Sequence, residues 1–125
     1  MTELTKFTWD GVKKENLTDL LSRQMIYGDK VMIARLEIKK GAVVPEHSHE
    51  NEQMTWIMKG ALKFRINGSE ITVGEGEILR IPSNVKHEAV AIEDTLDIDI
   101  FSPIRTDWIT GDDAYLRNKN NPYLK

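Results

Sequence analysis

The chain has 125 residues, with three His, no Cys, and 17 Lys and Arg against 20 Asp and Glu. This length predicts a single domain, and 40% hydrophobic residues beside 30% charged ones are typical of a globular protein rather than a disordered one. The net charge of -3 argues against nucleic acid as a partner, and the lack of Cys excludes disulfide scaffolds, thiolate metal sites and cysteine nucleophiles.

No apolar run approaches the ~18 residues of a membrane span, and the first residues lack the apolar core of a signal peptide. We therefore expect a cytoplasmic protein without a membrane partner.

Residues 1–22 are predicted as an N-terminal segment of strand or loop that could serve as a dimer arm. A short helix over 12–22 is the alternative for its second half.

Residues 23–109 consist of short apolar runs separated by turn signals, which predicts an all-β domain. The Asn67-Gly68 pair between two strand-like runs is a strong hairpin signal. The expected architecture is a single jelly-roll β-barrel of about eight to ten short antiparallel strands. Residues 110–125 form a polar tail for which we predict no structure. The expected strands are 31–38, 53–58, 62–66, 71–73, 78–81, 87–92 and 95–101.

The strand at 53–58 carries an apolar stripe on one side. If Gln53 points into the barrel, alternation directs Met54, Trp56 and Met58 outward. An exposed stripe of this kind predicts a homodimer interface. The alternative is a sheet face covered by the N-terminal segment.

The three histidines occupy two short stretches of the chain. His47 and His49 are two residues apart, so on a strand they point to the same side at a spacing of about 6.6 Å. Gln53 has the same parity, but a straight strand would carry it about 13 Å beyond His49, so residues 50–52 must bend if it joins them. Imidazoles at this spacing can bind one metal ion together with His87 from a partner strand. The alternatives are surface or core histidines and an ordinary polar Gln53.

The spacing of these residues resembles the two motifs of the cupin superfamily, with Gln53 in place of the usual Glu, Asn84 in place of Gly and Ala91 in place of Asn. The resemblance implies one divalent ion per chain (Zn, Ni, Mn, Fe or Co) held by His47, His49, Gln53 and His87. Because four neutral ligands leave the full charge on the ion, we expect Lewis-acid rather than redox chemistry. The first motif comprises Gly41, His47, His49, Gln53 and Gly60; the second comprises Gly76, Pro82, Asn84, His87 and Ala91.

The last predicted strand alternates acidic and apolar residues. Asp97, Asp99 and Phe101 share one side, while Leu, Ile and Ile share the other. Alternation alone leaves open which side faces the core, since a buried unpaired carboxylate is costly. If the acidic side faces inward, a carboxyl group near a metal could exchange protons with a substrate.

The run from Asp99 to Trp108 reads Asp-x-Phe-Ser-Pro-x-Arg-x-Asp-Trp and resembles the ending of the KdgF-type cupins of pectin and alginate degradation. That resemblance implies Asp99 and Arg105 as catalytic residues, and Phe101 and Arg105 as substrate-binding residues. It further implies a metal-dependent isomerase that converts unsaturated or deoxy uronates, which are small anionic sugar acids, into open-chain keto acids. The alternatives are a cupin dioxygenase, a metal-dependent lyase or a non-enzymatic binding protein. For Arg105 the alternative is a surface ion pair with Asp107 or Asp94.

Overall fold

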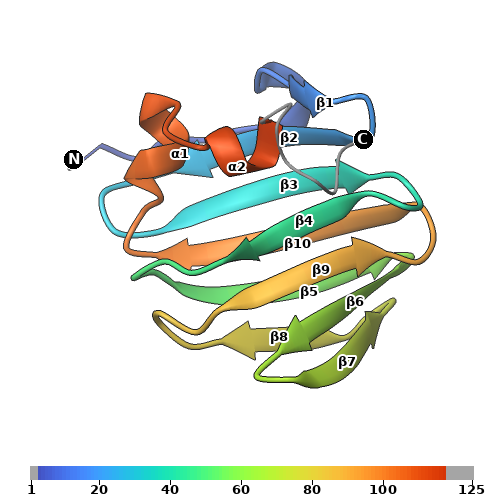
Figure 1. The fold of residues 1–125 in the computed structure, drawn as a ribbon. Coiled ribbons are helices and arrows are strands. Elements are labelled where there is room, and N and C mark those ends of the chain that lie inside the picture. Colours follow the sequence, from blue (N-terminus) through green and yellow to red (C-terminus); the bar gives the residue numbers. More distant parts are fainter. Residues whose placement is uncertain (1–2, 118–125) are drawn as a thin grey trace.

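The computed structural model describes residues 3–117, which form ten strands in two antiparallel sheets and three short helical segments (Figure 1). The first sheet has the order β1-β2-β3-β10-β5-β8 and the second has the order β4-β9-β6-β7. In the first sheet the bounds are β1 Glu15–Thr18, β2 Leu21–Tyr27, β3 Met32–Ile38, β10 Thr95–Ser102, β5 Glu52–Lys59 and β8 Ile78–Ile81. In the second they are β4 Val43–His47, β9 His87–Ala91, β6 Ala61–Ile66 and β7 Ser69–Gly74.

The prediction of short antiparallel strands is confirmed, but the strands do not close into one hydrogen-bonded barrel. Within residues 3–117 no strand of the first sheet pairs with a strand of the second. The two sheets instead pack against each other as a jelly-roll sandwich. Apolar side chains from both sheets, among them Leu36, Ile57, Leu62 and Phe64, form the common core.

Strand alternation explains which side chains reach the space between the sheets. On β5, Gln53, Thr55 and Ile57 are buried, whereas Met54, Trp56 and Met58 are exposed on the outer face as predicted. On β10 the acidic side faces inward, so Asp97, Asp99 and Phe101 are all buried. The pairing of β10 with β5 sets Asp99 opposite Thr55 and Phe101 opposite Gln53.

Two turns agree with the conformations that their residues favour. Asn67 and Gly68 both have positive φ, at 52° and 78°, in the hairpin between β6 and β7. Asn84, which replaces the Gly of the second cupin motif, has a φ of 64°. Asn tolerates this left-handed conformation better than other residues with a side chain, so the exchange preserves the turn before β9.

Both ends of the described chain carry more structure than the sequence indicates. A helix over residues 12–22 is wrong, because this stretch forms β1 and the start of β2, preceded by a single 3₁₀ turn at Trp9–Gly11. After β10 come α1 (Thr106–Thr110) and α2 (Ala114–Arg117), and Leu116 of α2 is buried. Part of the tail expected to lack structure is therefore packed, whereas residues 118–125 lie outside the described residues. None of the helices in residues 3–117 has the length and apolar character needed to cross a membrane.

Candidate functional site

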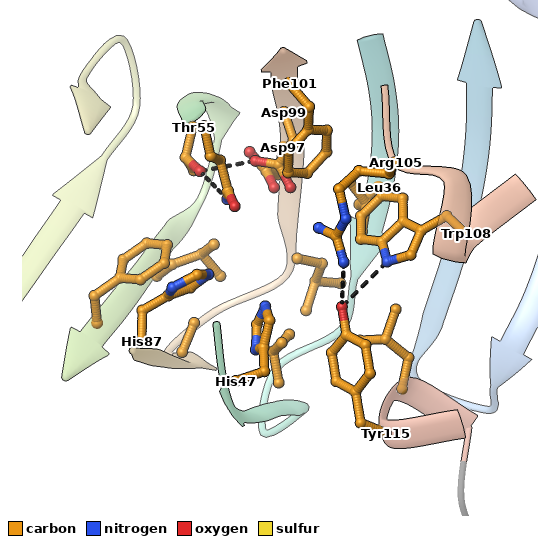
Figure 2. Close-up of a pocket in the computed structure, with 17 residues that line it drawn as sticks. Leu36, His47, Thr55, His87, Asp97, Asp99, Phe101, Arg105, Trp108 and Tyr115 are labelled. Atoms are coloured by element: carbon orange, nitrogen blue, oxygen red, sulfur yellow. Dashed lines mark hydrogen bonds between the residues drawn. The ribbon is translucent and has the colours of Figure 1, made fainter. Parts of the chain in front are cut away.

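A cavity between the two sheets collects most of the polar side chains singled out in the sequence (Figure 2). The four-stranded sheet supplies His47 at the end of β4 and His87 at the start of β9, which lie opposite each other in the strand register. The six-stranded sheet supplies the carboxyl groups, and the segment after β10 supplies Arg105. The polar and aromatic residues of the wall are His47, Gln53, Thr55, Phe64, His87, Asp97, Asp99, Phe101, Arg105, Trp108 and Tyr115.

The three histidines form one cluster, as predicted. Their potential ligand atoms lie within 4.8 Å of one another. The ring centroid of His87 is 4.2 Å from that of His47 and 5.1 Å from that of His49. His49 follows β4 and sits beside the cavity, next to Gln53, rather than in its wall. The three histidines therefore converge from two distant stretches of the chain, as the sequence predicts.

Backbone carbonyls orient all three imidazole rings. Nδ1 lies 2.7 Å from the Pro45 oxygen in His47, 3.0 Å from the Asn51 oxygen in His49, and 2.8 Å from the Val85 oxygen in His87. An Nδ1–H that donates to a carbonyl leaves Nε2 unprotonated in a neutral ring, with its lone pair available to a metal. Within the described residues Nε2 of His87 is buried without a hydrogen-bond partner, and a bound cation would satisfy it.

Burial keeps the histidine cluster neutral. Burial, with a smaller contribution from the nearby His87, lowers the pKa of His47 to about 3. Burial, followed by the charge of Arg105, lowers the pKa of His49 to about 4. The pKa of His87 is also lowered, mainly by burial. Neutral imidazoles are the form that binds metal, so the cluster requires no deprotonation to accept an ion at neutral pH.

Gln53 joins the cluster because residues 50–51 bend the chain between the loop and β5. Its Oε1 lies 3.1 Å from Nε2 of His49. The bend thus removes the wide separation between Gln53 and His49 that a straight strand would impose. Its amide nitrogen donates a 2.8 Å hydrogen bond to Thr55 Oγ1, which leaves the carbonyl oxygen turned toward the imidazole. Two lone-pair atoms that face each other across this distance suit a shared cation. The donor set of three imidazoles and one amide oxygen thus fits a divalent metal.

Thr55 connects the metal-binding candidates to the acidic pair. Its hydroxyl donates a 2.8 Å hydrogen bond to Asp99 Oδ1 while it accepts the Gln53 amide proton. Sequence reasoning did not single out Thr55, although it has the inward parity of Gln53. The chain of hydrogen bonds fixes the orientation of both Gln53 and Asp99.

Asp97 and Asp99 are buried side by side on β10, at 2% and 6% exposure. Burial, reinforced by the charge of Asp99, raises the pKa of Asp97 well above its ordinary value. Burial also raises the pKa of Asp99, and hydrogen bonds from Asp97 and Thr55 oppose this rise. The buried pair as a whole therefore holds a proton to higher pH than two exposed carboxyl groups would.

Arg105 is 1% exposed and pairs with Asp107 through Nε at 3.0 Å and Nη2 at 2.8 Å. Asp107 is therefore the ion-pair partner of Arg105, as the alternative interpretation expected. The pair does not lie on the surface as that interpretation assumed, because the arginine side chain is buried. The guanidinium stacks on the rings of Phe101 and Trp108, at 4.9 and 4.3 Å from their centroids. Stacking and pairing hold a positive charge at the cavity wall, where an anionic ligand could meet it.

Tyr115 of α2 is a cavity residue that the sequence did not reveal. Its ring centroid lies 4.6 Å from that of His47, and its hydroxyl oxygen accepts hydrogen bonds from Arg105 and Trp108. No local pattern could have found it, because it lies in a polar stretch that reads as an unstructured tail.

The model of the family described as cupin domain matches residues 34–102, which is more than half of the chain. The chain belongs to the cupin family. The match contains five residues singled out in the sequence, namely His47, His49, Gln53, His87 and Asp99.

Individual relatives place this cupin among small single-domain proteins. The structure of KdgF from Halomonas sp. superposes with a TM-score of 0.77 at 28% identity, covering 83% of this chain and 99% of that one. An RmlC-like cupin from Shewanella frigidimarina gives a TM-score of 0.77 at 26% identity, over 86% and 99% of the two chains. A protein named oxalate-binding protein from Thermotoga maritima is 26% identical over 91 residues, 72% of this cupin and 73% of the relative. This cupin therefore resembles KdgF in sequence and in fold.

Proposed function

We propose that this cupin is a metal-dependent isomerase that promotes ring opening and ketonisation of unsaturated or deoxy-keto uronic acids. The observation that carries the proposal is the placement of the Asp99 carboxyl group and the Arg105 guanidinium in one cavity with His47 and His87 of the histidine cluster. The similarity to KdgF supports the choice of substrate class. His47, His49, Gln53 and His87 would hold a divalent ion, which when bound supplies Lewis-acid polarisation of a substrate oxygen.

Asp99 is suited to move the proton that ketonisation requires. In an enol, the proton leaves the oxygen and a proton arrives at the neighbouring carbon of the double bond, so no oxidant or reductant is consumed. A single carboxyl group within reach of both atoms can accept the first proton and donate the second. The raised pKa of Asp99, caused chiefly by burial, brings the carboxyl closer to the range in which it both accepts and gives up a proton.

Arg105 and Phe101 would hold the sugar acid in place. The guanidinium presents planar N–H donors that match a carboxylate. Phe101 is 1% exposed and lines the cavity edge-on to His49, with ring centroids 5.8 Å apart. An aromatic surface at this position excludes water from the reacting carbons and packs on the apolar face of a sugar ring.

A second candidate is a non-enzymatic protein that binds a small carboxylate. The relative from Thermotoga maritima, named an oxalate-binding protein, favours it, together with the buried cation of Arg105 in the cavity wall. Such a protein would give a ligand-dependent increase in melting temperature without turnover. A cupin dioxygenase or a lyase would differ from both by oxygen uptake or by an elimination product.

Proton NMR with the unsaturated galacturonate released by a pectate lyase tests the proposal. The metal-loaded protein is expected to speed the loss of the vinylic signal and, in D₂O, to place deuterium on the carbon beside the new ketone. Chelator treatment should remove the acceleration, and added metal should restore it. A rate equal to that without protein would overturn the isomerase proposal, and a melting shift with oxalate alone would favour the binding protein.

A further inference from the structure

Tyr115 contributes to the cavity from outside the matched cupin region. It lies on α2, thirteen residues beyond the end of the match at residue 102. Its hydroxyl oxygen accepts hydrogen bonds from Nη2 of Arg105 at 3.0 Å and from Nε1 of Trp108 at 3.1 Å. Figure 2 shows the Tyr115 ring rising beside His47, with its hydroxyl directly below the guanidinium.

The nitrogen atoms of the Arg105 guanidinium differ in whether the protein already uses them as hydrogen-bond donors. Nε and Nη2 are engaged by Asp107, and Nη2 also donates to Tyr115. In the part of the chain that the structure describes, Nη1 makes no hydrogen bond, and it is not among the buried atoms that lack a partner. Because Arg105 is 1% exposed but lines the cavity, Nη1 is the donor that a ligand in the cavity would meet.

The position of Tyr115 is itself fixed by the residues around it. Leu116 is buried in the core, and Asp113 binds both Arg23 of β2 and Arg117 of α2. The Asp113 and Arg23 side chains are both fully buried, with 2.8 Å between Oδ2 and Nη2. Because these contacts hold α2 in place, the Tyr115 hydroxyl can fix the orientation of the Arg105 side chain that donates to it.

We propose that Tyr115 is a positioning residue that holds the Arg105 guanidinium with Nη1 toward the cavity and thereby sets the preference for ligands that carry a carboxylate. The inference rests on the proposed function, because it assigns the recognition of the acid group in the same site. Asp107 alone fixes one edge of the guanidinium, whereas Tyr115 fixes the end of Nη2. Without the hydroxyl, the guanidinium is held by stacking and by the Asp107 carboxylate, whose side chain is 37% exposed, and the two groups can shift together so that Nη1 leaves the cavity.

The test is carried out on the Zn²⁺-loaded protein with two ligands that differ only in the acid group, D-galacturonate and its neutral methyl ester. Tyr115→Phe keeps the ring on His47 and removes the hydroxyl. We expect about tenfold weaker binding of galacturonate by calorimetry, unchanged binding of the ester and an unchanged zinc content. Tyr27→Phe, at an exposed position on β2, is the matched control and should change neither ligand. Equal affinities of wild type and Tyr115→Phe for galacturonate, or an equal loss for both ligands, would overturn the proposal.

A kinetic measurement separates this inference from the proposed function. On the unsaturated galacturonate, Tyr115→Phe is expected to raise KM by a similar factor and leave kcat within about twofold, as for loss of uniform substrate binding. If the wild type shows no turnover, the isomerase proposal fails and the binding comparison still decides the role of Tyr115. If the Zn²⁺-loaded wild type binds galacturonate no more tightly than the ester, both the acid-recognition role of Arg105 and the positioning role of Tyr115 are overturned.

Discussion

The guanidinium of Arg23 and the carboxylate of Asp113 meet at 2.8 Å although 90 residues separate them in the chain. Both side chains are fully buried, and Glu15 and Arg117 extend the pair into a network. The network joins the first two strands of the six-stranded sheet to the last described helix. It fixes the segment that carries Tyr115 and Leu116 against the cavity.

Loss of Asp113 should destabilise the fold strongly. Asp113→Ala leaves Arg23 buried with only Glu15 as a counter-charge, so we expect a loss of about 3 kcal/mol in the free energy of unfolding, measured by urea denaturation at pH 7. Glu70→Ala, which breaks the exposed Arg65–Glu70 pair, is the control and should cost less than about 1 kcal/mol. Equal stabilities of the two variants would contradict a structural role for the buried pair.

The same pair predicts a dependence on acid. Burial alone would raise the pKa of Asp113, but hydrogen bonds from Arg117 and Arg23 outweigh this and lower it. A carboxyl group whose pKa is lower in the folded state contributes stability above its unfolded pKa of about 4, and the contribution disappears as pH falls through the folded pKa. The stability difference between wild type and Asp113→Asn should therefore shrink below about pH 4. A difference that stays constant down to pH 2.5 would be the contrary result.

Asp97 should have the opposite effect on stability. Because burial, together with the neighbouring Asp99, raises its pKa, the folded protein holds a proton that the unfolded chain releases above about pH 4. In metal-free protein, this group makes folding less favourable as pH rises, by up to about 1.4 kcal/mol per pH unit. Asp97→Asn removes the titration, so its advantage over wild type should be larger at pH 7.5 than at pH 5 in urea titrations. A variant no more stable than wild type at either pH would show that Asp97 ionises without cost.

Substitution of Asp99 should separate metal binding from catalysis. Asp99→Asn keeps the hydrogen bond from Thr55 and touches none of the three imidazoles, so metal content by elemental analysis should stay unchanged while turnover of the unsaturated uronate is lost. His87→Ala, in contrast, removes a proposed metal donor and should weaken metal binding by more than about 100-fold, the upper range for loss of a supporting hydrogen bond. Retained activity in Asp99→Asn, or loss of its metal, would remove the proton-transfer role from Asp99.

The outer face of the six-stranded sheet remains a predicted dimer interface. Met54, Trp56 and Met58 are 36%, 39% and 42% exposed on β5. We expect a dimer in gel filtration at micromolar concentration, and a monomer when a charge is introduced by Trp56→Lys. Ile71→Lys, at an exposed apolar position on β7 of the other sheet, should leave the dimer intact. A monomeric wild type would mean that the exposed stripe is a surface of the single chain.

The sequence predicts those features of this protein that depend on the alternation of side chains along a strand or on residues a few positions apart. Strand parity gave the outward side of Met54, Trp56 and Met58, and the Asn67-Gly68 pair located a hairpin. Parity could not decide whether Asp97 and Asp99 point inward. Their burial depends on the hydrogen bond that Thr55 donates to Asp99 across the sheet, and on the interaction between the two carboxyl groups along β10.

Other features depend on contacts that no local pattern records. The approach of Gln53 to His49 needs the bend after β4, which polar residues permit but do not specify. The helix α2 is too short to give a periodic signal, and its position depends on the ion pair between Asp113 and Arg23. These long-range charge pairs and loop conformations account for the residues that sequence reasoning missed.

The wall of the cavity draws on side chains from Leu36 to Leu116. A chain emerging from the ribosome therefore carries all three imidazoles long before it has enclosed them, and the final wall is added only when the last described helix has docked. A truncation before residue 114 would consequently keep His47, His49, Gln53 and His87 but open the cavity on the side that Tyr115 and Leu116 close.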